Sequence, residues 1–140
     1  MAESAMISLD LPATHRFLNI LSACIGEMLK RADPPAQENQ IYELQLAAQE
    51  IAANIVDHAY GESAGRIIIE LSYDAADHQV MIVFSDRGII YNEQGAPALP
   101  SVDDSASGGM GLFLVMSLVD DVTYERRDET NVWQITKRLA

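Results

Sequence analysis

Apolar and polar residues alternate along five short stretches of the chain, which is the pattern of a strand with one buried face. In the first stretch, Ile7, Leu9 and Leu11 alternate with polar residues, and Pro12 closes it. Turns at 74–78 and 128–131 would join the later stretches into two hairpins. The pattern predicts strands at 7–11, 65–73, 79–85, 122–127 and 132–139.

Two other segments repeat apolar residues every three or four positions, the spacing of one helical face. They predict helices at 14–32 and 35–59, separated by Asp33-Pro34-Pro35, where Asp33 favours an N-cap and proline tolerates the first turn. Residues 111–119 have the composition of a short buried helix. Residues 86–107 show no sustained period and contain several Gly and Pro residues, which predicts a long loop.

The order of these elements favours one class of fold. Hairpins with helices before and between them indicate a two-layer α/β (α+β) sandwich rather than a doubly wound parallel sheet. We expect a mixed, mostly antiparallel sheet that helices cover on one face. A chain of 140 residues with 49% hydrophobic content suits a single domain with one core, here residues 1–140.

The chain is strongly acidic, with 21 Asp and Glu residues against 9 Lys and Arg and a formal net charge of −12. This charge would repel a phosphate backbone or an anionic lipid surface, so we expect no direct contact with nucleic acid or membrane. Cys24 is the only cysteine, which excludes an intramolecular disulfide and suits a reducing cytoplasm. The first residues also lack the basic start of a secretory signal, which favours a cytoplasmic location.

Candidate chemistry begins on the second predicted helix. Glu50 and Asn54 are four residues apart and share one side of it, with Asp57 and His58 one turn further on. A carboxylate beside an amide oxygen is a plausible general base with a magnesium ligand, because magnesium prefers oxygen donors. The same spacing is common on solvated helix faces, so it does not decide the function alone.

Two further features occur where elements begin or end. Asp86 ends a strand two residues before Gly88, and is either a turn residue or an acceptor for the amino group of a base. The glycine-rich turn 105–112 leads into the third helix, where free backbone N–H groups and the helix dipole can hold an anion. It matches neither the P-loop nor the dinucleotide pattern, and a closely packed helix start is the alternative.

Taken together, segments 50–60, 86–88 and 108–112 resemble the N, G1 and G2 boxes of the GHKL (HATPase_c) ATPase superfamily. The small size and the segments 120–127 and 131–132 look most similar to RsbW-type anti-sigma factor serine/threonine kinases. The resemblance implies a Bergerat-type sandwich that binds ATP and Mg²⁺, with an ATP lid at 86–107. The chain departs from the superfamily at Ile90, where the G1 box usually carries a second glycine.

The resemblance also implies a role for each matching residue. Glu50 would be the general base, Asn54 would hold Mg²⁺, and Asp86 would bind the adenine amino group. His58 would either touch a phosphate or cap the end of its helix. The residues implied to bind ATP are Asn54, Asp57, His58, Asp86, Gly88, Ser107, Gly108, Gly109, Met110, Gly111 and Leu112.

The function implied is phosphorylation of a STAS-domain anti-anti-sigma protein and sequestration of a sigma factor or analogous regulator by partner switching, with a possible homodimer. Two alternatives stay open: a non-catalytic GHKL module that binds nucleotide or has lost it and works only by partner switching, and the detached catalytic domain of a histidine kinase. Residues 88–110 contain no Lys or Arg, which leaves Arg87 as the only cation expected beside the lid. Phosphoryl transfer develops negative charge, so either a partner or a second subunit supplies a cation, or transfer is slow.

Overall fold

The structure of the protein is a computed structural model that describes residues 3–60, 65–89 and 110–139. The described elements follow the predicted order of strands and helices, with a short 3₁₀ turn, η1, before the first helix. No helix in these three ranges is long and apolar enough to cross a membrane. The elements are β1 (Ala5–Pro12), η1 (His15–Phe17), α1 (Leu18–Lys30), α2 (Glu38–His58), β2 (Arg66–Asp74), β3 (Gln79–Asp86), α3 (Met110–Leu118), β4 (Asp121–Arg127) and β5 (Thr130–Arg138).

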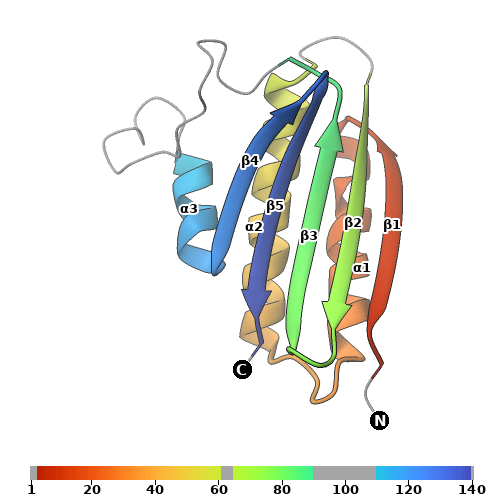
Figure 1. The fold of residues 1–140 in the computed structure, drawn as a ribbon, viewed down its shortest axis with the longest axis vertical. Helices are drawn as coiled ribbons and strands as arrows, with labels where there is room; N and C mark the ends of the chain where they lie inside the picture. The colour runs from red at the N-terminus through yellow and green to blue at the C-terminus, as the bar shows by residue number, and fades with distance from the viewer. Residues whose placement is uncertain (1–2, 61–64, 90–109, 140) are drawn as a thin grey trace.

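The five strands form one sheet in the order β1-β2-β3-β5-β4, and all four pairings are antiparallel. Helices α1 and α2 lie side by side against one face of the sheet, and α3 lies beside α2 near β4 (Figure 1). The α+β sandwich with helices on one face is therefore confirmed. The one refinement is that the described sheet is antiparallel throughout rather than mixed.

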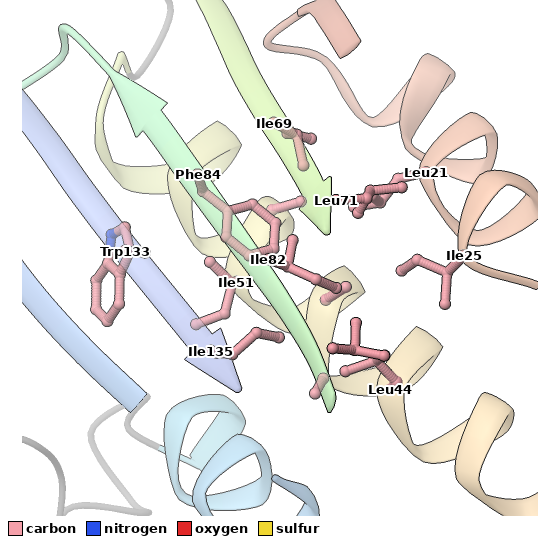
Figure 2. Close-up of a cluster of buried hydrophobic side chains, with 14 of the residues drawn as sticks. Leu21, Ile25, Leu44, Ile51, Ile69, Leu71, Ile82, Phe84, Trp133 and Ile135 are labelled. Carbon is pink, nitrogen blue, oxygen red and sulfur yellow. The ribbon is translucent and has the colours of Figure 1, made fainter. Parts of the chain in front are cut away.

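The core lies between the sheet and the two long helices. Inward side chains of β2, β3 and β5 meet the apolar stripes of α1 and α2 (Figure 2). Each large apolar side chain buried here contributes about 1.5–3 kcal/mol. Completely buried or nearly so are Leu21, Ile25, Leu44, Ile51, Ile69, Leu71, Ile82, Phe84, Trp133 and Ile135.

Helix α2 begins later than the sequence pattern predicts. Its N-cap is Gln37, not Asp33, and its first residue is Glu38. The side chains of Gln37 and Gln40 each accept a hydrogen bond from the other's backbone N–H, which satisfies two amides that the helix leaves free. This reciprocal cap outweighs the local preference of Asp33 and the two prolines.

The last hairpin also has a tighter turn than predicted. Thr130 and Asn131 belong to β5, where they pair with Arg127 and Arg126. The expected four-residue turn at 128–131 was wrong, and two residues connect the strands, with Asp128 at a φ of 55°. Two-residue turns with positive φ match the right-handed twist of antiparallel strands, which favours the shorter connection.

Candidate functional site

The C-terminal end of α2, the end of β3 and the start of β5 meet at one end of the sandwich (Figure 1). A small cavity of about 10 Å³ lies between them, roughly enough for one water molecule. Three residues singled out in the sequence, Asn54, His58 and Asp86, therefore lie around one space. The full lining is Asn54, Ile55, His58, Ala59, Asp86, Ile89, Asn131 and Trp133.

Asp86 is a carboxylate inside the protein, only 2% exposed. Its Oδ1 accepts hydrogen bonds from Nδ2 of Asn131 at 2.8 Å and from the Gly88 amide at 2.9 Å. Its Oδ2 is buried and has no hydrogen-bond partner among the described residues. Burial raises the pKa of Asp86 above the ordinary aspartate value, and its bonds to Asn131 and Gly88 partly oppose this. A buried acceptor left open is costly, so a bound donor would be stabilised here.

Asn131 joins Asp86 to the last hairpin. Besides its bond to Asp86, its Nδ2 donates to the Ile89 carbonyl at 2.8 Å. Its Oδ1 accepts from Nη1 of Arg126 at 3.0 Å and from the Tyr124 hydroxyl. Sequence reasoning used this residue only for the family resemblance and gave it no role in the site, although it alternates in phase with the inward Trp133 of β5. A polar side chain at an inward strand position needs buried partners, and that was the available signal.

The segment after β3 is held from two sides. The Arg87 amide donates to the Tyr60 hydroxyl at 2.8 Å, and the Ile89 amide donates to the Ala59 carbonyl at 2.7 Å. From the other side, Nη1 of Arg126 donates to the Gly88 carbonyl at 2.7 Å. The end of β3 is thus fixed to both α2 and β4.

The expectation that Arg87 is the only cation beside the proposed lid was wrong. Arg126, 38 residues from Gly88 in the chain, reaches the Gly88 carbonyl through the fold. Arg87 itself is exposed, and its Nη2 lies 3.8 Å from Oε2 of Glu129. A cation from the protein's own chain therefore stands at the start of the 86–107 segment.

Glu50 lies one turn before Asn54 on α2, and both side chains are half-buried. A β-carbon added to Gly111, in the first turn of α3, would lie only 2.6 Å from Oε2 of Glu50. The absence of a side chain at Gly111 is what lets this turn approach the Glu50 carboxylate. Asn54, in contrast, lines the cavity with Asp86.

The other expected site residues have different environments. Asp57 is exposed, and its Oδ1 lies 2.7 Å from Nε2 of His15, so it already has a polar partner. His58 is the last residue of α2, and Ala59 follows as the C-cap. The Leu112 side chain is buried in the core, which leaves its backbone as the part available to a ligand. Met110 begins α3, and residues 107–109 lie outside the described ranges.

Gly88 allows the backbone after β3 to pass close to the end of α2. A β-carbon at this position would lie 2.3 Å from the Ala59 carbonyl oxygen, the same oxygen that accepts the hydrogen bond from the Ile89 amide. Because backbone atoms cannot move aside cheaply, Gly88→Ala should destabilise the protein by about 1–3 kcal/mol, measured by urea unfolding. Gly26→Ala is the control, since its added carbon meets only the Gln45 side chain, at 3.1 Å. Equal stability of the two variants would contradict this account of Gly88.

The described residues contain no group of three or more His, Cys, Asp and Glu side chains placed to hold a metal ion. This does not conflict with a magnesium site, because magnesium in nucleotide sites keeps several waters and uses one or two protein oxygens plus phosphates. The Asn54 amide oxygen is of the right type for such a ligand.

Comparison with known proteins places these features in context. Residues 11–137 match the family model described as histidine kinase-like ATPase domain. The serine-protein kinase RsbW of Staphylococcus epidermidis is 26% identical over 136 residues, covering 92% of this chain and 84% of its own. The corresponding kinase of Staphylococcus aureus strain Newman is 27% identical over 124 residues, covering 84% and 77%.

Two solved structures share the fold. The RsbU and RsbW domains of Rv1364c from Mycobacterium tuberculosis match with a TM-score of 0.69 at 21% identity, over 96% of this chain. The chain spans only 32% of that longer protein. The histidine kinase domain of the Erythrobacter litoralis EL346 blue-light activated histidine kinase matches with a TM-score of 0.57 at 17% identity, covering 88% of this chain and 59% of that one.

Proposed function

The chain belongs to the family of histidine kinase-like ATPase domains, and on this premise we propose that it is an ATP-dependent serine/threonine protein kinase. The relatives named serine-protein kinase RsbW, which align over most of its length, support transfer to a serine or threonine hydroxyl. We further propose that residues 1–140 form one catalytic domain, with 86–107 as the lid over the nucleotide. Its location would be the cytoplasm.

The observation that carries this proposal is the open acceptor on Asp86. An adenine ring presents an exocyclic amino group, whose N–H would satisfy the buried Oδ2. The bonds from Asn131 and Gly88 hold the other carboxylate oxygen, so Oδ2 is the atom left for the base. Few buried carboxylates stay unsatisfied without a functional reason.

The phosphates would lie toward the first turn of α3, where Gly111 leaves backbone close to Glu50. The free N–H groups at a helix start suit an anion. Asn54 would contribute its amide oxygen to Mg²⁺, and the glycines at 108 and 109 are proposed to add N–H groups. Bound ATP supplies the phosphoryl group, and Mg²⁺ offsets its charge.

Glu50 would act as the general base. Its carboxylate would accept the proton of the partner's hydroxyl as that oxygen forms a bond to the γ-phosphorus and the bond to the bridging oxygen breaks, releasing ADP. The protein then contributes mainly position and charge, as in other phosphoryl transfers. Arg126 would hold the Gly88 carbonyl during this step rather than touch the phosphates.

We propose two protein partners and no contact with nucleic acid or membrane. One is a STAS-domain anti-anti-sigma protein that carries the phosphorylated hydroxyl. The other is a sigma factor or analogous regulator, held until the first partner displaces it. The acidic chain suits a basic regulator, because complementary charge speeds encounter. We also propose that two copies of this chain form a homodimer.

One observation favours the alternative of a non-catalytic binding module. The cavity beside Asp86 has a volume of about 10 Å³, far below that of an adenine ring, so the base could enter only if the lining moves. Ile89 is the lining residue with the most exposed large apolar side chain, and its displacement would open the cavity.

A calorimetric titration with ATP and Mg²⁺ distinguishes a chain that binds nucleotide from a degenerate module that has lost it. We expect the wild type to bind, and Asn54→Ala to weaken binding about ten- to hundredfold, because a ligand to a charged group is lost. Asn39→Ala, which removes an exposed asparagine from the first turn of the same helix, is the control. Absence of binding by the wild type at millimolar ATP would support the module instead.

A further inference from the structure

Lys137 carries a charge into the interior of the protein. It lies on β5 in phase with the inward Trp133 and Ile135, and the residue is 9% exposed. Its Nζ donates to the Leu118 carbonyl at 2.7 Å and lies 3.0 Å from Oε2 of Glu43. A buried ammonium is tolerated only when such partners replace its lost water, so these contacts are specific rather than incidental.

The two partners of Lys137 belong to different helices. Leu118 is the last residue of α3, and its carbonyl is one of those that a helix leaves without an internal partner. Glu43 lies near the start of α2. Lys137 therefore ties the C-terminal end of α3 to both β5 and α2, and its charge also complements the negative end of the α3 dipole.

Besides Lys137, the chain just after α3 is bound to β5, because the Asp120 amide donates to the Thr136 carbonyl at 2.9 Å. The helix itself does little to determine its position along α2. It has nine residues, too few to be stable alone, and it is apolar on every side. Phe113 and Met116 face solvent while Leu112 and Val115 are buried, so its sequence distinguishes inner from outer face only weakly. Apolar contacts lack direction, whereas a hydrogen bond to the last carbonyl specifies one register.

The opposite end of α3 meets Glu50. Gly111 is about 10 Å from Leu118 along the helix axis, given 1.5 Å per residue. α3 lies against α2 and runs opposite to it, so Glu43 and Glu50 stand near its two ends (Figure 1). Because a short helix moves as a rigid body, a shift at Leu118 also moves Gly111 relative to Glu50.

We propose that Lys137, together with Glu43, is a positioning residue that sets the register of α3 and thereby places its first turn against Glu50. Neither residue lines the cavity at Asp86, and both act through the helix. This inference rests on the proposed function, since that first turn is where we place the phosphates of ATP.

The test compares four variants by calorimetric titration with ATP and Mg²⁺ and by hydrogen exchange of the α3 amides. Lys137→Met keeps the methylene stem and should raise the Kd for ATP about tenfold and speed α3 exchange by a similar factor. Lys137→Arg keeps the donors and should restore most of both. Glu43→Gln should give an intermediate effect. Ile69→Val, a core change on β2 away from α3, should lower thermal stability without changing either measurement.

The inference would be overturned if Lys137→Met kept both the ATP affinity and the α3 protection of the wild type. It would also be overturned if Ile69→Val changed both measurements as much as Lys137→Met does. If Lys137→Met does not fold, Glu43→Gln decides, because Glu43 is partly exposed and its change removes only the ion pair with Lys137. Wild-type affinity and wild-type α3 protection in Glu43→Gln would then overturn the inference. If the wild type itself does not bind ATP, the proposed function fails, and the exchange data still decide whether Lys137 holds α3.

Discussion

Replacing Glu50 with glutamine is expected to slow phosphoryl transfer by about 10²–10⁴-fold, the usual contribution of a general base. Glutamine has almost the same shape but cannot accept a proton from the partner's hydroxyl. ATP binding should be nearly unchanged, because the role assigned to Glu50 concerns the hydroxyl and not the nucleotide. The measurement is a single-turnover transfer from radiolabelled ATP to the phosphoacceptor protein, beside a calorimetric titration with ATP.

Glu38→Gln is the matched control for this variant, since Glu38 is an exposed acid in the first turn of the same helix. Its transfer rate should equal that of the wild type. A Glu50→Gln protein that transfers at the wild-type rate would eliminate Glu50 as the base. Loss of ATP binding in parallel with the rate would instead assign Glu50 to the nucleotide site.

The second large effect is expected from Asp86→Asn, which should weaken ATP binding by about 10²-fold. The amide oxygen of the new asparagine would accept the hydrogen bonds from Asn131 and Gly88 in place of Oδ1, which puts the amide nitrogen at the position of Oδ2. A donor would then face the donor of adenine, and the pair repels. Inosine triphosphate carries a carbonyl at that position, so its affinity should fall less or rise. Calorimetric titration with both nucleotides measures the switch.

The same variant should change how stability depends on pH. Burial raises the pKa of Asp86, so the folded state holds this proton more tightly than the unfolded state does. The Asp86 carboxyl therefore contributes its full stabilisation at pH values below its pKa in the unfolded state. This contribution is lost as the pH rises through its pKa in the folded state. The melting temperature of Asp86→Asn, relative to that of the wild type, should therefore rise from acidic to neutral pH. Asp77→Asn, on an exposed turn, should run parallel to the wild type. A parallel curve for Asp86→Asn, with ATP binding intact, would contradict both expectations.

Most of the fold could be predicted from the spacing of apolar residues alone, because each strand and each long helix buries one face. The predicted strand at 65–73, for example, differs from β2 (Arg66–Asp74) by one residue at each end. The start of α2 could not be predicted, because the cap depends on two glutamine side chains, Gln37 and Gln40, that bond each other's backbone. Glutamine is a weak cap by composition, whereas Asp33 is a strong one, so local preference pointed to the wrong residue.

Only part of the candidate site could be predicted from the sequence. Asn54, His58 and Asp86 were singled out in advance, and the fold places them around one cavity. Asn131 was given no role in the site, because the bond that joins it to Asp86 spans 45 residues and no local pattern indicates such a contact. Placing it in a turn also concealed its inward orientation. Arg126 was missed for the same reason, and with it a cation beside Gly88.

The position of β5 has a consequence for biosynthesis. It is the last strand in chain order, yet it lies inside the sheet between β3 and β4. During translation, β1, β2 and β3 emerge first, and β3 keeps one unpaired edge that another chain could occupy. Asp86 lies on that edge, opposite Asn131. Arrival of residues 130–138 therefore closes the edge and completes the cavity in the same folding step.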